Sequence, residues 1–160
     1  MLVLGIDPGT RIAGYAIVES DGFALRRVAS GVIKLNPREE MSARLASLYT
    51  GVQDILGRHS PSEAAVEKVF FGHNVKSALT LGQGRGAMLA ALGGSEIPVF
   101  EYAPAQVKQA VTGRGSATKE QVAKMVTVLF GGYTAETPDE SDALAVAICH
   151  CNRSRTTGIL

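Results

Sequence analysis

Three β-rich segments joined by turn sequences occupy the first 33 residues, and they constrain the fold more than any other feature of the chain. They span residues 2–7, 12–19 and 23–33, and each is rich in β-branched and apolar side chains. The connecting sequences, DPGTR and SDG, contain the proline, glycine, aspartate and serine residues that favour turns. The chain is therefore predicted to begin with a three-stranded antiparallel meander.

The remainder of the chain alternates between helical and extended patterns, which is typical of strands that run parallel. The predicted elements are a helix over 38–59, a short buried strand ending at Glu67, a helix over 75–92, a strand over 97–103, and helices over 104–111, 118–130 and 139–151. We expect one α/β domain over residues 1–160. Its sheet should be mixed, with three antiparallel strands followed by parallel strands, and helices should flank it.

Composition limits the classes of partner. The formal net charge is +1, so any binding of nucleic acid must depend on a local cationic patch rather than on overall charge. No apolar run approaches the length of about 18 residues that a membrane span needs, which predicts no membrane partner. The first residues lack the pattern of a signal peptide, and only two cysteines occur. These features predict a cytoplasmic protein.

Four carboxylates fall at the ends of predicted elements. Asp7 ends the first strand, Glu67 ends the strand AAVE, and Asp139 and Asp142 stand at the start of the last predicted helix. Because Asp139 and Asp142 are three residues apart, they share one helix face. An acid at a helix start also has a structural explanation, since it complements the helix dipole, and for Asp142 alone this alternative carries equal weight.

Asp7 is the most informative of the four, because it interrupts an apolar strand. A carboxylate in such a place is unfavourable unless it is paired, hydrogen-bonded or bound to a metal ion. Oxygen ligands of this kind favour Mg²⁺ or Mn²⁺ over Zn²⁺. Four acids could hold two such ions, the arrangement that hydrolyses phosphodiesters by in-line attack of water.

Several longer motifs resemble a known family. The segments GIDPGTRIAGYAIVE, VEKVFFGHN, SALTLGQGRG, VFEYAPAQVKQAVTGRGSATKEQV and PDESDALAVAICHC occur in the order and at the spacing seen in the RuvC family of Holliday junction resolvases. This resemblance covers nearly the whole chain. It implies an RNase H-like fold, a homodimer, and Mg²⁺-dependent nicking of two symmetric strands at a four-way DNA junction, with work beside the RuvA and RuvB motor proteins in recombination and repair. The products should carry 5′-phosphate and 3′-hydroxyl ends.

The resemblance also implies roles for particular residues. By position, the four acids of the family fall on Asp7, Glu67, Asp139 and Asp142, although some relatives carry a histidine at the position of Asp139. Asp7 is expected to bridge two metal ions, with Mn²⁺ able to replace Mg²⁺. Pro8 and Gly9 would then turn the chain away and leave room for the scissile phosphate.

Two other interpretations use the same motifs. GIDPGT is also similar to the first phosphate loop of actin-like and Hsp70-like ATPases, but those proteins need two such lobes and this chain has room for one. A YqgF-type nuclease shares the start but is typically shorter and would lack VKQAVTGRGSATKEQV. A binding module without cleavage activity would bind its partner equally well without metal.

The predicted DNA contacts rest on charge and on the family. Lys108, Arg114, Lys119 and Lys124 form a local surplus of cations, which an ordinary solvated helix face could also explain. The resemblance assigns backbone contacts to Lys108 and Lys119, whereas Arg114 and Lys76 rest on charge and location. These side chains would contact the phosphates of the junction.

Two further predictions concern base stacking and dimerisation. Phe70 and Phe71 follow Glu67 with only Lys68 and Val69 between, and adjacent rings on extended backbone point to opposite faces, so one ring should face the core and the other should be free. Burial of both rings in the core is the alternative, since aromatic side chains favour burial. The family resemblance points to Phe70 as the exposed ring that stacks on an unpaired base. Gly82 and Gly86 are four residues apart in a predicted helix, which favours close approach of another helix, such as one across a dimer interface.

Overall fold

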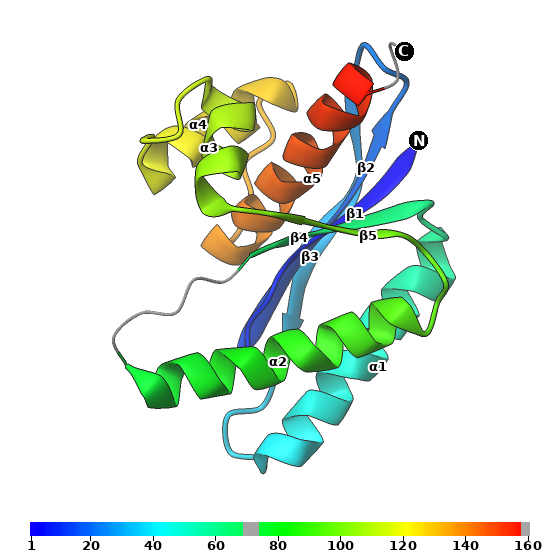
Figure 1. The fold of residues 1–160 in the computed structure, drawn as a ribbon, viewed down its shortest axis with the longest axis vertical. Coiled ribbons are helices and arrows are strands. Elements are labelled where there is room, and N and C mark those ends of the chain that lie inside the picture. The colour runs from blue at the N-terminus through cyan, green and yellow to red at the C-terminus, as the bar shows by residue number, and fades with distance from the viewer. Residues whose placement is uncertain (69–73, 158–160) are drawn as a thin grey trace.

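We describe the protein from a computed structural model, in which the placement of residues 1–68 and 74–157 is described. The N-terminal meander is present and forms three strands of a five-stranded sheet (Figure 1). Its strands are β1 (Leu2–Asp7), β2 (Ile12–Ser20) and β3 (Leu25–Lys34), and each pairs antiparallel with the next. The third strand starts two residues later than predicted, because the Asp21 side chain accepts hydrogen bonds from the backbone nitrogens of Phe23 and Ala24 and closes a turn.

The other two strands of the sheet pair in parallel, as predicted. They are β4 (Glu63–Glu67) and β5 (Val99–Tyr102). β4 pairs with β1 and β5 pairs with β4, so the strand order is β3-β2-β1-β4-β5. The mixed five-stranded sheet expected from the sequence is thus confirmed, and the first and fourth strands lie side by side in its centre.

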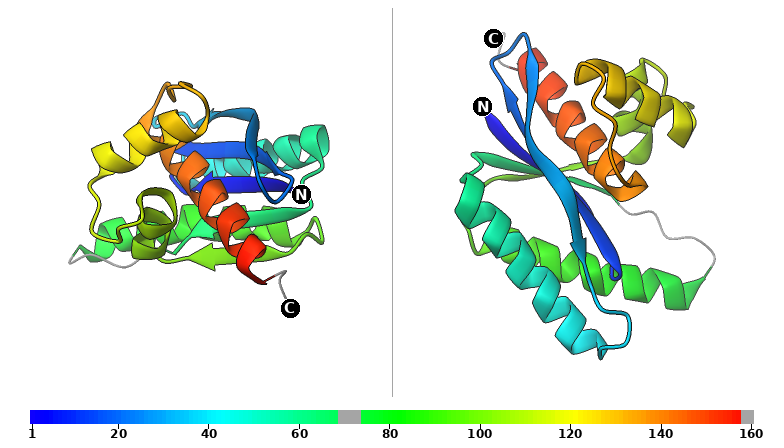
Figure 2. Two further views of the ribbon diagram at one scale, coloured as in Figure 1. Left: turned by 90° about the horizontal axis from the view of Figure 1, so that it is seen from above. Right: turned by 180° about the vertical axis from the view of Figure 1, so that it is seen from behind.

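Five helices in the described residues cover the sheet. They are α1 (Met41–His59), α2 (Val75–Gly93), α3 (Pro104–Thr112), α4 (Lys119–Leu129) and α5 (Pro138–Thr157). α1 and α2 pack on one face, and α3, α4 and α5 lie on the other (Figures 1 and 2). None of these helices is long and apolar enough to cross a membrane.

Alternation along the central strands assigns each side chain to one of these layers. In β1, Leu4 and Ile6 belong to the buried cluster against α1 and α2, whereas Val3 belongs to the cluster against α5. In β4, Ala65 likewise belongs to the cluster against α5. Because side chains alternate with a period of two, the odd-numbered residues of both strands face the layer that contains α5.

Candidate active site

Two of the four predicted acids end neighbouring strands. β1 and β4 are parallel with Ile6 opposite Val66, so Asp7 and Glu67 follow at the same edge of the sheet. Both residues have odd numbers and therefore face the layer of α5. The two carboxylates reach the same side of the sheet because the two strands are in register.

The other two acids come from the first turn of α5. This helix begins at Pro138, whose fixed φ and missing N–H suit the first helical position. The hydroxyl of Thr137 accepts a hydrogen bond of 3.2 Å from the backbone nitrogen of Glu140, which caps the helix start. Asp139 and Asp142 then lie on one face, so the helix start presents two carboxylates.

Two glycines allow this helix to lie directly on the sheet. Gly14 is opposite Asp7 in the pairing of β1 with β2, and a Cβ atom added to it would lie 1.9 Å from the backbone oxygen of Asp139. A Cβ atom added to Gly5 would lie 2.4 Å from the backbone oxygen of Ala143. Any side chain at either position would push α5 away from Asp7. This role was not predicted from the sequence, although a glycine inside a strand is a recognised sign of close backbone approach.

Glu140 anchors the start of α5 and was also missed. Its side chain is buried and accepts hydrogen bonds from the hydroxyls of Ser30, at 2.5 Å, and Tyr133, at 2.7 Å. The backbone nitrogen of Glu136 donates a third, at 2.7 Å. Burial opposes ionisation of Glu140, but these hydrogen bonds outweigh it and lower its pKa. The residue between the two candidate ligands therefore ties α5 to β3 and to the preceding loop.

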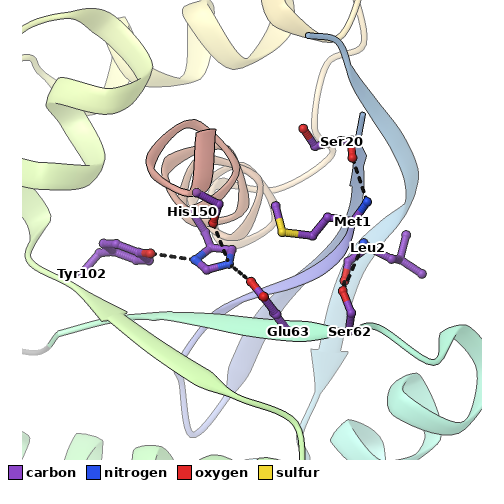
Figure 3. Close-up of polar contacts among 8 residues, drawn as sticks. Met1, Leu2, Ser20, Ser62, Glu63, Tyr102 and His150 are labelled. Atoms are coloured by element: carbon purple, nitrogen blue, oxygen red, sulfur yellow. Dashed lines mark hydrogen bonds and ion pairs between the residues drawn. The ribbon is translucent and has the colours of Figure 1, made fainter. Parts of the chain in front are cut away.

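A buried histidine in the C-terminal half of α5 holds this helix against the sheet (Figure 3). His150 of α5 packs over β4 and β5, with Nδ1 2.6 Å from the Tyr102 hydroxyl and Nε2 2.5 Å from a carboxylate oxygen of Glu63. The Glu63 carboxylate can only accept a hydrogen bond, so Nε2–H donates to it, and in a neutral ring Nδ1 accepts from the Tyr102 hydroxyl. Burial raises the pKa of Tyr102 to about 12, so this hydroxyl stays protonated. This network joins α5 to the two parallel strands of the sheet.

The four acids lie close enough to affect one another. Burial is the largest cause of a rise in the pKa of Asp7 from 3.8 to about 7. Neighbouring negative charges add to this rise; they belong to Asp142, Glu67 and Asp139. The pKa of Glu67 is also raised, first by burial and then by the charge of Asp142. The site concentrates negative charge where solvent screens it poorly.

Two lysines predicted to bind DNA lie beside these acids. The Lys119 ammonium is 3.0 Å from a carboxylate oxygen of Asp142, and this hydrogen bond raises the pKa of Lys119. Lys108 and Lys119 line a small hollow of about 50 Å³ together with Glu67 and Asp142. The positive charges of both lysines act to lower the pKa of Glu67. The cations from α3 and α4 thus border the acidic cluster.

The remaining predicted DNA contacts lie further out. Lys76 borders a hollow of about 300 Å³ together with Thr10, near the turn that follows Asp7. Arg114 lines a separate hollow of about 420 Å³ between the α3–α4 connection and α4, together with Lys124. Phe70 lies outside the described residues, so its predicted stacking role stays a prediction.

The chemistry of the four carboxylates fits a hard divalent cation. Oxygen ligands, partial burial and mutual repulsion all favour binding of a positive ion. Among residues 1–68 and 74–157, no three acidic, histidine or cysteine side chains are already arranged around one point as ligands. Coordination by three carboxylates therefore requires side chains of the cluster to move together.

Comparisons with known proteins agree on one family. The family model for the crossover junction endodeoxyribonuclease RuvC matches residues 3–150. The RuvC protein of Geotalea uraniireducens is 46% identical over 160 residues, which cover 100% of this chain and 94% of that protein. The RuvC protein of Pelobacter propionicus is 49% identical over 150 residues, covering 94% and 85% of the two chains.

Solved structures give the same result for the fold. T. thermophilus RuvC in complex with Holliday junction substrate superposes with a TM-score of 0.91 at 37% identity, covering 98% of this chain and 96% of that chain. The yeast mitochondrial Holliday junction resolvase Ydc2 superposes with a TM-score of 0.69 at 12% identity, covering 98% and 80%, which is evidence for the fold alone. The expected RNase H-like fold is confirmed. On the family model and these relatives, the chain belongs to the RuvC family of crossover junction endodeoxyribonucleases.

Proposed function

We propose that this protein resolves Holliday junctions by hydrolysing one phosphodiester bond in each of two symmetric strands. The observation that carries the proposal is the meeting of four carboxylates at the ends of β1 and β4 and the start of α5, with two lysines at the border of the cluster. The likeness to T. thermophilus RuvC, whose structure contains Holliday junction substrate, supports the choice of a four-way junction over other DNA.

The proposed reaction needs divalent ions at the four acids. Two Mg²⁺ ions, for which Mn²⁺ can substitute, would lower the pKa of a water molecule at the scissile phosphate and stabilise charge on the leaving 3′ oxygen. Asp7 has the position expected of a shared ligand, because the charges of all three other carboxylates raise its pKa. Glu67 and Asp139 would each hold one ion or orient the water, and Asp142 would complete the set.

The chain's own cations have a separate role. Lys119 and Lys108 lie at the edge of the acidic cluster, where a phosphate would otherwise be repelled by the carboxylates. Their ammonium groups would bind non-bridging phosphate oxygens and hold the backbone for in-line attack. Attack by water on phosphorus breaks the bond to the 3′ oxygen, so one product end carries a 5′-phosphate and the other a 3′-hydroxyl that a ligase can reseal.

A homodimer would present two such sites to the symmetric junction. One face of α2 supports this proposal: Val75 is 82% exposed and Leu79 is 64% exposed, and they continue into Gly82 and Gly86. Among the described residues, apart from the adjoining backbone of α2 itself, no atom lies within 4 Å of a Cβ atom built on either glycine, so this face is open to close contact with a second copy. Sedimentation should show a dimer at working concentrations, and Gly86→Arg should shift it toward monomer. A strict monomer even with junction DNA would contradict the proposal.

Family membership also supports cooperation with the RuvA and RuvB motor proteins and action on cytoplasmic DNA. Both remain predictions from the family. Co-sedimentation of the protein with RuvA and RuvB on a four-way junction is the direct test, and failure of the three proteins to assemble on one junction would count against the first prediction.

Cleavage is tested on a synthetic four-way junction beside a linear duplex of the same sequence, with wild-type protein and Asp7→Asn in Mg²⁺. Paired, ligatable nicks on the junction alone, abolished in the variant while junction binding persists, would establish the resolvase. The alternative of a binding module predicts junction binding with no nicks in Mg²⁺ or Mn²⁺.

A further inference from the structure

Arg85 of α2 contacts the backbone of a candidate metal ligand. Its Nη1 donates a hydrogen bond of 2.9 Å to the backbone oxygen of Glu67, and its Nη2 is 2.7 Å from a carboxylate oxygen of Glu101. The Arg85 side chain is only 15% exposed, so few other conformations are open to it. One guanidinium therefore connects α2, the end of β4 and the middle of β5.

The position of this contact matters because β4 ends there. Glu67 is the last residue of β4, and the next backbone nitrogen, from Lys68, still donates to the Tyr102 oxygen of β5 at 2.7 Å. Arg85 binds the carbonyl oxygen of Glu67, which belongs to the same peptide group as the Lys68 nitrogen. A hydrogen bond to a peptide group restrains its rotation, and rotation of this peptide would swing the Glu67 side chain relative to Asp7.

The adjacent residue of α2 contacts the segment that follows the other catalytic strand. A Cβ atom added to Gly84 would lie 2.7 Å from Cγ2 of Thr10 and 3.4 Å from the backbone oxygen of Gly9. Arg44 of α1 holds the same turn by donating to the backbone oxygen of Thr10, with Nε at 3.0 Å. Gly84 and Arg85, consecutive in α2, thus lie against the turn that follows β1 and against the end of β4.

We propose that Arg85 is a positioning residue for cation binding, which sets the Glu67 carboxylate at the correct distance from Asp7. This inference rests on the proposed metal-dependent function and extends it to a residue outside the acidic cluster. Arginine suits the role because its planar fork serves two acceptors at once, whereas lysine is a single point charge on a flexible stem. α2 also carries the proposed dimer face, so one helix contacts both the acidic cluster, through Arg85, and the proposed second copy.

The test compares Arg85→Gln with Arg85→Lys and with the matched control Glu101→Gln. The control removes the ion pair of Arg85 but leaves its bond to the Glu67 carbonyl. Isothermal titration calorimetry with Mn²⁺ alone measures cation affinity without catalysis. Fluorescence anisotropy in EDTA measures junction affinity without a cation, and circular dichroism checks the fold of each variant.

We expect Arg85→Gln to weaken Mn²⁺ binding about tenfold, as removal of a group that orients a metal ligand commonly does. Junction affinity in EDTA should stay unchanged, Arg85→Lys should recover part of the loss, and Glu101→Gln should bind Mn²⁺ like the wild type. If Arg85→Gln does not fold, Arg85→Lys is compared with Glu101→Gln instead. Weaker Mn²⁺ binding in Arg85→Lys than in Glu101→Gln supports the role of Arg85, and equal affinities overturn it.

The outcomes separate this inference from the proposed function. Wild-type protein that binds Mn²⁺ no better than Asp7→Asn would overturn the metal site, and the inference with it. If the wild-type protein binds Mn²⁺ tightly and the folded Arg85 variants bind it equally well, the metal site stands and only the role of Arg85 is overturned. An equal loss in Glu101→Gln would also overturn it, because the bond to Glu67 would then not be the cause.

Discussion

Replacing Asp7 by asparagine should stabilise the protein in the absence of divalent ions while removing its activity. The folded state raises the pKa of Asp7 to about 7, whereas an unfolded chain leaves it near 3.8. Between these values the folded state holds more protons, so stability falls as pH rises through this window. Above about pH 7 the ionised Asp7 carboxylate lowers the stability of the folded state by its full amount. Asparagine removes this loss of stability because an amide carries no charge.

The size of the effect follows from the pKa. At about 1.36 kcal/mol per pKa unit, the rise from 3.8 to about 7 corresponds to about 4 kcal/mol. This value is an upper bound, because the neighbouring carboxylates can relax or take up a proton themselves. A gain of about 2 kcal/mol in the free energy of unfolding at pH 8 is therefore expected.

Urea unfolding in EDTA at a series of pH values measures this gain. The difference between Asp7→Asn and wild type should be near zero at pH 4 and reach its plateau above pH 7. Asp54→Asn is the matched control, since Asp54 is exposed on α1 and the same chemical change there should have little effect. Added Mg²⁺ should stabilise the wild type, which binds it, more than Asp7→Asn, and so reduce the difference in the free energy of unfolding between the two proteins. A difference independent of pH, or a loss of stability in Asp7→Asn at pH 8, would refute the argument.

Three other substitutions test the placement of α5 and of the lysines. Gly14→Ala should lower the free energy of unfolding by about 2 kcal/mol and weaken Mn²⁺ binding, because its Cβ atom would meet the Asp139 carbonyl. Thermal unfolding measures the first effect and calorimetry with Mn²⁺ measures the second. Unchanged values would contradict the close approach of α5 to Gly14. Tyr102→Phe should lower the free energy of unfolding by about 1–3 kcal/mol, because it leaves Nδ1 of buried His150 unpaired. Urea titrations measure this loss. An unchanged free energy of unfolding would show that water replaces the hydroxyl. Lys119→Ala should keep its fold, because the Lys119 side chain is 77% exposed, but weaken junction binding and reduce the slope of log affinity against log salt by about 1. Anisotropy titrations over a range of salt concentrations measure that slope, and an unchanged slope would exclude a phosphate contact.

Much of the fold was predictable because local signals agreed with the tertiary structure. β1 has the predicted bounds, and the sheet changes from antiparallel to parallel where the sequence changes from turn-linked strands to alternating strands and helices. The errors fall at element ends. β3 starts after the turn closed by Asp21, and α5 continues to Thr157 rather than ending at residue 151.

The candidate site was predictable in part. A carboxylate at the end of an apolar strand and two acids in the first turn of a helix can be recognised locally, and the motifs of the family pointed to the same residues. The supporting residues could not be found in this way. Glu140 and Arg85 look like ordinary charged helix residues in the sequence, and their roles come from Ser30, Tyr133 and the Glu67 carbonyl, which are distant along the chain.

The sequence by itself determined which elements form and which acids stand at their ends, because turn residues, apolar periodicity and helix starts act over a few neighbouring positions. Only the tertiary structure decided that these ends meet. Strand register brings Asp7 beside Glu67, and the missing side chain of Gly14 lets the first turn of α5 reach them. The raised pKa of Asp7 is the physical result, since it arises from burial and from charges that are remote in sequence and close in space.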